Sequence, residues 1–270
     1  MADLKLLQAG ASELGVELTR EQLSAFSLYM SELLRWNRRA NLTAITAPDE
    51  IQIKHFLDSL TCLLAFPLPK PEEGAAGGSP TSSVDLTERL NRGAGIACID
   101  VGSGAGFPGL PLKICLPQMK LTLVDSVGKK TAFLAHMVEL LRLEDVRVIT
   151  ARAEELAREH GEREQYDVAV ARAISRLAVL AELCLPFCRV GGRLIAPKKG
   201  DVAREMEEGR HAVERLGGCY AQPVPVRLSL LEDERVLVVV EKVAPTPAQY
   251  PRRPGMPAKR PLVASARAGW

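Results

Sequence analysis

The chain has 270 residues, 47% of them hydrophobic, enough to bury the core of one large domain or of two small ones. Its 35 lysines and arginines nearly balance 33 aspartates and glutamates, and the net charge of +2 neither requires nor excludes a nucleic-acid partner. No apolar run approaches a membrane span and the 6 cysteines form no CxxC pair, so we expect a cytoplasmic protein with reduced thiols, no membrane association and no metal site.

The first 66 residues predict a helical extension. Thr19 and Gln22 have the spacing of a capping box, and apolar residues recur behind them at helical spacing. A second helix is expected at about 49–64, with its apolar residues on one side. The stretch WNRRANLTAIT, residues 36–46, lies between these helices and is expected to form a loop.

The chain changes in composition at residues 67–94, which are rich in Pro, Gly, Ser and Ala. Such a composition is typical of a flexible link or a surface insertion, and we expect a flexible insertion here. The far end of the chain, residues 245–270, forms a second Pro-rich segment, which is basic.

Between these segments, residues 95–244 predict an α/β domain. Short apolar runs alternate with helical patterns, which implies a mostly parallel sheet with helices on both faces. The expected parallel strands are, in chain order, 96–101, 121–125, 146–150, 166–171 and 193–196. The last two apolar runs, 224–230 and 236–243, are separated by LEDE and predict a hairpin. We therefore expect the final strand to enter the sheet antiparallel to the others.

A glycine-rich turn, IDVGSGAGFPGLPL, follows the first predicted strand. In a doubly wound sheet, ligands bind beyond the carboxyl ends of the strands, where the strand order reverses. Glycine permits a positive φ and has no side chain to hold a ligand away from the backbone. The turn holds Gly102, Gly104, Gly106 and Gly109, and this spacing predicts close contact between backbone and ligand.

Two cofactors compete for this turn. The last three glycines match GxGxxG, and Asp125 lies at a suitable distance to hold a ribose, which fits a nicotinamide dinucleotide. Asp100, just before the glycines, suits a cationic amino-acid ligand better than a pyrophosphate, and the expected antiparallel last strand differs from the usual dinucleotide fold. These features favour S-adenosylmethionine. Glycines that serve only a tight turn are the structural alternative.

The same residues resemble a known family. DVGSGAGFPGLPL is similar to the cofactor loop of Rossmann-like class I methyltransferases, and more specifically of the RsmG (GidB) family, which methylates N7 of one guanine in small-subunit ribosomal RNA. Further stretches match in order: NLTAI, HFLDSL, LTLVDSVGKKTAFL, RAEEL, DVAVARA, PKKG and YPRRPGMPAKRPL. The insertion at 67–94 and the residues after Leu262 depart from the family pattern. The competing readings are an NAD-dependent oxidoreductase and a noncatalytic RNA-binding module on a methyltransferase fold.

The resemblance implies which residues contact the cofactor. They are Gly102, Phe107, Ala153, Glu154 and Arg172. Asp125, at the end of the second predicted strand, could accept hydrogen bonds from the ribose hydroxyls, with helix capping as its structural alternative. For Glu154 the alternative is a carboxylate favoured by a helix dipole, and for Arg172 it is an ion pair with a surface carboxylate.

Methylation at N7 needs no general base, because this nitrogen carries a lone pair and no proton. We therefore expect catalysis by alignment and desolvation, with no catalytic side chain. His55 and Asp58 lie three residues apart on a predicted helix and could form an acid–base pair, but a hydrogen bond that docks the helical region is the preferred reading. Cys184 and Cys188 in LCLPFC read as buried, which argues against a thiolate mechanism.

The expected partner is 16S rRNA or the small ribosomal subunit, bound by a protein that we expect to be a monomer. Basic residues near the expected site edge and in the tail suit phosphate contacts and base stacking. The candidates are Lys198, Lys199, Arg252, Arg253, Lys259 and Arg260. A solubilising, disordered end is the structural alternative for the tail.

Overall fold

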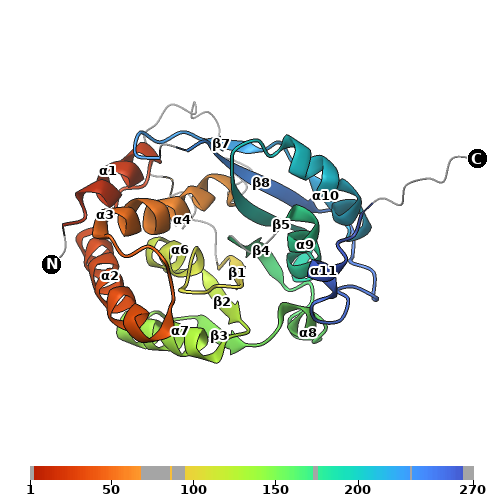
Figure 1. Cartoon of the computed structure of the whole chain (residues 1–270), viewed down its shortest axis with the longest axis horizontal. Coiled ribbons are helices and arrows are strands. Elements are labelled where there is room, and N and C mark those ends of the chain that lie inside the picture. The colour runs from red at the N-terminus through yellow and green to blue at the C-terminus, as the bar shows by residue number, and fades with distance from the viewer. Residues whose placement is uncertain (1–2, 68–85, 87–94, 173–175, 232, 264–270) are drawn as a thin grey trace, which may run out of the picture.

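The computed structural model describes residues 3–67, 86, 95–172, 176–231 and 233–263. Most of the expected insertion at 67–94 and the end of the basic tail lie outside the described residues. The described chain folds around one twisted sheet, with helices on both of its faces (Figure 1). Within these residues, no helix is long and apolar enough to cross a membrane.

The sheet follows the order β3-β2-β1-β4-β5-β8-β6, with β7 paired to β8. Its strands are β1 (Ala97–Val101), β2 (Lys120–Asp125), β3 (Val146–Thr150), β4 (Tyr166–Val170), β5 (Cys188–Lys199), β6 (Gly218–Tyr220), β7 (Val224–Val226) and β8 (Arg235–Lys242). The first five are parallel, and β8 runs antiparallel to β5, so the predicted sheet and its reversed last strand are confirmed. The short strand β6, which pairs with β8, was not expected from the sequence.

The strand order reverses between β1 and β4, because the chain first builds outward to β3 and then returns to the other side of β1. The carboxyl ends of the five parallel strands therefore share one edge of the sheet, with this switch point in the middle. Since β8 is antiparallel, its first residue, Arg235, also lies at this edge, opposite Lys199.

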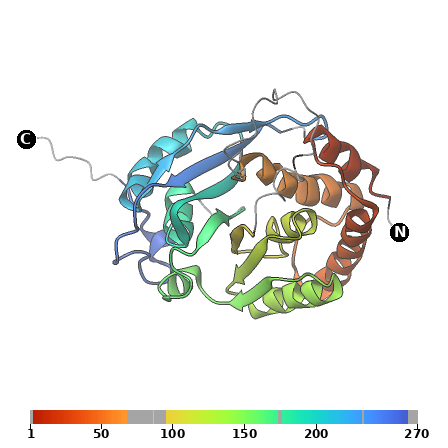
Figure 2. The ribbon, with the colours of Figure 1, turned by 180° about the vertical axis from the view of Figure 1, so that it is seen from behind.

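Two apolar cores cover the two faces of the sheet. One core joins the N-terminal helices to α6 (Gly109–Cys115) and α7 (Gly128–Leu140). The other packs α8 (Ala153–Leu156), α9 (Leu177–Cys184) and α10 (Ala203–Arg215) against the opposite face. The view from behind shows the N-terminal helices on one side of the sheet and α9 and α10 on the opposite side (Figure 2).

The N-terminal region contains α1 (Lys5–Glu13) and α2 (Arg20–Ala40), followed by one continuous helical run. The run consists of α3 (Pro48–Ile51), the π-helix η1 (Gln52–Leu57), α4 (Asp58–Leu60) and the 3₁₀ helix η2 (Thr61–Ala65). The predicted capping box is present, since Thr19 and Gln22 each accept a hydrogen bond from the other's backbone N–H. The loop expected from residue 36 is wrong in its first part: α2 continues to Ala40 and ends at Asn41 in the left-handed conformation (φ 48°).

The C-terminal segment, residues 244–263, packs against the sheet and its helices, and we call it the strap. Arg163 donates hydrogen bonds to the carbonyl oxygens of Thr246 (2.7 Å) and Tyr250 (2.9 Å). Arg252 forms a forked ion pair with Glu182 on α9, whose side chain is fully buried. These contacts hold the strap in place and bring the short helix α11 (Met256–Lys259) next to α9.

Candidate cofactor and substrate site

A cavity of about 250 Å³ lies at the carboxyl ends of β1, β2 and β3. Four of the residues predicted to contact the cofactor line it: Gly102, Asp125, Ala153 and Glu154. Its other walls come from the turns after the three strands, from α9 and from the strap. The structure thus brings together most of the predicted cofactor residues, which come from three different strand ends.

The glycine turn keeps its backbone open to this cavity. Gly102 and Gly104 have φ of 71° and 59°, values that residues with a side chain rarely adopt. Asp125 fixes the turn, because its Oδ2 accepts a hydrogen bond from the N–H of Gly104 (2.9 Å) and its Oδ1 accepts one from Val127 (2.9 Å). Each carboxylate oxygen retains a second lone pair, so Asp125 can hold this turn and still accept a ligand hydroxyl.

Asp100, at the end of β1, is fully buried and accepts a hydrogen bond from the N–H of Gly109 through Oδ2 (2.8 Å). A Cβ at Gly109 would lie 2.7 Å from that oxygen, so packing explains this glycine. Within the described chain, the other oxygen, Oδ1, has no hydrogen-bond partner. Burial raises the pKa of Asp100 to about 7. An unpartnered buried carboxylate oxygen is suited to a cationic donor such as an ammonium group.

Glu154 lies in the first turn of α8, is buried, and accepts a hydrogen bond from the N–H of Gly255 through Oε1 (2.9 Å). Gly255 and Ala258 of the strap line the same cavity. Glu154 therefore joins the strap to the cavity wall, a role beyond the helix-dipole alternative considered from the sequence.

The other two residues predicted to contact the cofactor, Phe107 and Arg172, are not among the described residues that line this cavity. The Phe107 ring is buried and stacks on the His55 ring with 4.4 Å between centroids. The Arg172 guanidinium carbon lies 5.1 Å from the Phe107 centroid. Through this stacking, Phe107 joins the glycine turn to the N-terminal helical run.

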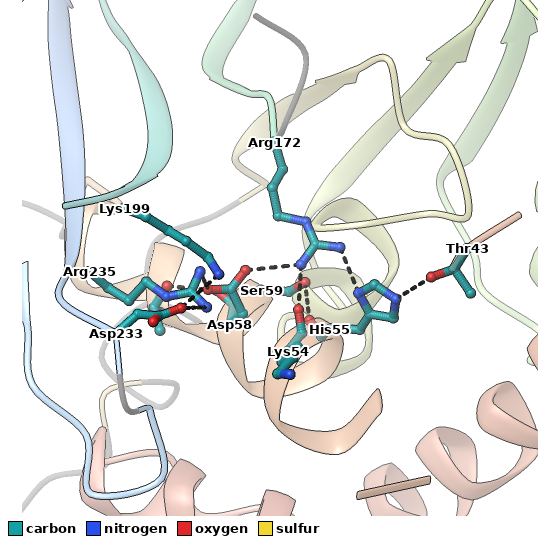
Figure 3. A network of polar contacts seen from close by, with 10 residues as sticks. Thr43, Lys54, His55, Asp58, Ser59, Arg172, Lys199, Asp233 and Arg235 are labelled. Carbon is teal, nitrogen blue, oxygen red and sulfur yellow. Dashed lines mark hydrogen bonds and ion pairs between the residues drawn. The ribbon is translucent and has the colours of Figure 1, made fainter. Parts of the chain in front are cut away.

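Arg172 joins β4 to the N-terminal helical run (Figure 3). Its Nη1 donates to Asp58 Oδ2 (2.9 Å) and to the Lys54 carbonyl oxygen (2.9 Å). Arg235, from β8, donates to the second oxygen of Asp58 (2.8 Å). One buried carboxylate thus bridges two arginines from two strands, and the preferred sequence reading of His55 and Asp58 as docking groups agrees with this geometry.

His55 completes this network. Its Nδ1 lies 3.0 Å from Arg172 Nη2 and its Nε2 lies 2.7 Å from Thr43 Oγ1. A guanidinium can only donate, so Nδ1 accepts, and we assign the proton to Nε2, which donates to Thr43. Burial and the nearby Arg172 charge lower the pKa of His55 to about 4. Both ring nitrogens are therefore engaged in a neutral, structural role.

A second cavity, of about 410 Å³, opens beside this network at the ends of β4 and β5. Its walls are Ile45, Lys54, His55, Asp58, Arg172, Pro197, Lys198, Lys199 and Arg235. We call it the basic hollow. Among the described residues it shares no wall with the cavity at β1, β2 and β3.

The comparisons with known proteins agree with this geometry. The model of the family described as GidB, rRNA small subunit methyltransferase G, matches residues 22–71 and 81–225. The chain is 50% identical over 248 residues to the ribosomal RNA small subunit methyltransferase G of Roseiflexus sp. (strain RS-1), which covers 92% of this chain and 95% of that protein. It is 46% identical over 254 residues to the protein of the same name from Dehalococcoides mccartyi (strain CBDB1), covering 94% and 97%. The chain belongs to this family.

Among solved structures, TYW2 of M. jannaschii in complex with AdoMet is 13% identical, with a TM-score of 0.45 over 63% of this chain and 80% of that one. The family membership identifies an enzyme of the class I methyltransferases, with S-adenosylmethionine as methyl donor. It rules out the two competing readings, the NAD-dependent oxidoreductase and the noncatalytic module.

The basic residues predicted to bind RNA fall into two groups on this methyltransferase. Lys198 and Lys199 line the basic hollow, where they pair with Glu205 (2.7 Å) and Asp233 (2.8 Å). The rest come from the strap, where Arg253, Lys259 and Arg260 are exposed. Arg252 differs from them because its guanidinium is committed to buried Glu182, which places it in the docking of the strap.

Several residues at these cavities were not expected from the sequence. Gly255 and Ala258 line the first cavity and Arg235 lines the second. Gly255 and Ala258 lie within the stretch YPRRPGMPAKRPL, which resembles the family but was not assigned to the cofactor, and Arg235 lies outside the quoted motifs. The order of apolar runs does place Arg235 at the start of an antiparallel last strand, and this is the one signal that could have put it at the functional edge.

Proposed function

We propose that this methyltransferase transfers a methyl group from S-adenosylmethionine to N7 of a guanine in 16S rRNA. The observation that carries the proposal is the cavity at β1, β2 and β3, which is lined by an open glycine turn and by Asp125, a carboxylate that can accept ribose hydroxyls. Asp100, which has an unpartnered buried carboxylate oxygen, lies at the end of β1 just before this turn. It acts as a monomer in the cytoplasm, where small subunits are assembled.

The residues present fit the donor. S-adenosylmethionine supplies an electrophilic methyl group on a positively charged sulfur. Asp125 would hold the ribose hydroxyls and Glu154 and Ala153 would border the base, while the free oxygen of the buried Asp100 would attract the positively charged amino-acid end. Gly102 keeps the backbone close, while Phe107 and Arg172 close the acceptor side of the turn.

The acceptor nitrogen needs no base, and the nearby groups are poorly placed to act as one. His55 uses both ring nitrogens in contacts with Arg172 and Thr43. Burial raises the pKa of the Cys188 thiol to about 12 and that of Cys184 also upward, so neither forms a thiolate nucleophile at neutral pH. The rate then comes from holding two reactants in line in a site that excludes water.

The test is transfer of labelled methyl groups to 30S particles and to naked 16S rRNA, both isolated without the modification, followed by mapping of the labelled base. We expect one N7-methylguanine, and the preferred particle shows when the enzyme acts. Label at a different base would overturn the N7 assignment while keeping the donor. If the enzyme binds S-adenosylmethionine but transfers no methyl group to either RNA, the assignment of 16S rRNA as its substrate would be wrong. Light scattering during gel filtration measures the oligomeric state.

A further inference from the structure

The cavity at β1, β2 and β3, proposed above to bind S-adenosylmethionine, is called the donor cavity below. The basic hollow lies across the switch point from it, on the same edge of the sheet. Its floor and walls come from the ends of β4 and β5, from the start of β8 and from the N-terminal helical run. Phe107, in the glycine turn, stacks on His55, which lines the hollow. The hollow is thus joined to the glycine turn through the stacked rings of Phe107 and His55.

The charges around the hollow do not balance. Asp58 bridges Arg172 and Arg235, and Asp233 pairs with Lys199 (2.8 Å) and lies 3.9 Å from Arg235. The other two cations of the walls, Lys54 and Lys198, pair with Glu50 and Glu205. Among the described residues, five cations therefore share four carboxylates, which leaves one positive charge. The Nε of Arg235 is buried and, in the chain as described, has no hydrogen-bond partner. A surplus cation with an unused donor fits an anionic ligand with acceptor atoms.

The hollow also has apolar and flat walls. Ile45 and Pro197 contribute aliphatic surface, and the His55 ring is held neutral and rigid between Arg172 and Thr43. A volume of about 410 Å³ falls within the range of small-molecule sites, roughly 300–1,000 Å³. A nucleotide fits both features, because its flat base can cover the apolar walls and its phosphate can pair with the surplus positive charge. A phosphate alone would leave the apolar walls in contact with water.

The position of guanine N7 in RNA is a further reason to expect a pocket for the base. In a paired RNA helix, N7 of guanine lies in the deep, narrow major groove, which protein side chains cannot enter. An enzyme that modifies this atom therefore acts on an unpaired nucleotide or takes the base out of the helix, and reads it in a pocket.

We propose that the basic hollow receives the target guanosine, unstacked from the RNA, with its base between Ile45 and Pro197 and its phosphate toward Lys199 and Arg235. Asp58 is the positioning residue that orients Arg172 and Arg235 around the nucleotide. This inference rests on the proposed function for its substrate, and it adds the residues that hold the acceptor.

Two variants and one control test the proposal. Ile45→Trp fills the hollow and removes no charge, so kcat/KM for the RNA substrate falls by about 100-fold, as expected when a reacting base is misplaced. Lys199→Gln removes one phosphate contact, so KM rises and the slope of log affinity against log salt drops by about 1. Arg210→Gln is the control, because Arg210 is as exposed as Lys199 (56% and 58% for the side chains), is also ion-paired, and lies on α10 away from the hollow. Its kinetics match the wild type.

S-adenosylmethionine affinity, measured by calorimetry without RNA, separates the hollow from the donor cavity. We expect it to stay within about twofold of the wild type in all three variants, because the donor cavity shares no wall with the hollow. Normal RNA kinetics in a folded Ile45→Trp enzyme would overturn the proposal. So would an equal loss of donor affinity, since it would point to a general distortion.

Photocrosslinking tests whether the hollow holds the target nucleotide, even if the wild type transfers no methyl group. The probe is 16S rRNA transcribed with 6-thioguanosine and assembled into 30S particles. A crosslink from thioguanosine to a peptide containing Ile45 or Pro197, lost in Ile45→Trp, supports the hollow as the nucleotide pocket. Crosslinks confined to the strap would contradict it. The methyl-transfer result tests the proposed function separately.

Discussion

At the scale of single residues, the donor cavity depends on backbone that only glycine supplies without strain. Gly102 combines a φ of 71° with a place on the cavity wall, which it shares with Asp125. A side chain there costs about 1–3 kcal/mol in backbone strain alone, and it also occupies the ligand's approach.

Gly102→Asp should therefore lower S-adenosylmethionine affinity by more than about 100-fold, because strain, bulk and a third negative charge act together. Gly15→Asp is the matched control. Gly15 has a similar φ of 74° and no atom within 4 Å of an added Cβ, so it reproduces the backbone strain far from the cavity. Calorimetry on both folded variants makes the comparison. Unchanged affinity in Gly102→Asp would place the donor elsewhere.

At the scale of elements, the strap is a wall of the donor cavity that the sheet alone does not provide. Arg163 donates to carbonyl oxygens of the strap and to that of Ala157, so one guanidinium ties the strap to the turn after α8. Gly255 then donates to Glu154. The order of the strap and the shape of the cavity are thus coupled.

Arg163→Met removes these hydrogen bonds while keeping an aliphatic side chain. We expect faster hydrogen exchange across residues 246–260 and a loss of donor affinity of about tenfold, the size of one lost charged hydrogen bond. Mass-spectrometric exchange and calorimetry measure the two effects. Arg204→Met, which removes an exposed arginine paired with Glu208 on α10, is the control for charge. Loss of strap protection with full donor affinity would show that the strap is not part of the site.

At the scale of the whole molecule, the N-terminal helices and the sheet share one core, and polar groups at the functional edge join them. His55 links this junction to pH. Burial and the Arg172 charge lower its pKa to about 4 in the folded protein, whereas in the unfolded chain the pKa is the ordinary 6.5. Between about pH 6.5 and pH 4 the unfolded state therefore binds more protons than the folded one, and stability falls as the pH falls.

This linkage predicts that the free energy of unfolding drops by about 2 kcal/mol from pH 7 to pH 5 on account of His55 alone. Urea unfolding of His55→Gln should show a shallower pH dependence by that amount. His160→Gln removes an exposed histidine instead and should keep the slope of the wild type. Parallel slopes for the wild type and His55→Gln would mean that His55 is not held neutral in the fold.

Much of this arrangement follows from local sequence patterns. The strands β1 to β4 begin and end within a residue of the predicted runs, because buried strands are short, apolar and bounded by turns. The antiparallel last strand followed from a hairpin signal. The glycine turn and Asp125, at the end of a predicted strand, pointed to the sheet edge where the structure has the cavity at β1, β2 and β3.

What the sequence could not predict are contacts made by charged residues across long distances in the chain. Arg163, Glu182 and Arg252 look like ordinary surface charges, yet they fix the strap. The Pro-rich composition of the tail suggests an extended or disordered segment, and only buried partners elsewhere determine its path. Phe107 and Arg172 were grouped with the donor residues, but the packing of the N-terminal helices against them places both at the border of the basic hollow.

The late position of the strap in the chain has a consequence for protein synthesis. All parallel strands and Glu154 leave the ribosome before Gly255 and Ala258, which complete the donor cavity. A nascent chain, or one cut short by a stop codon near residue 245, would hold a finished sheet but would lack Arg252, the partner of the Glu182 carboxylate, and the strap residues that line the cavity. We therefore expect this methyltransferase to bind its donor only when its own translation is nearly complete.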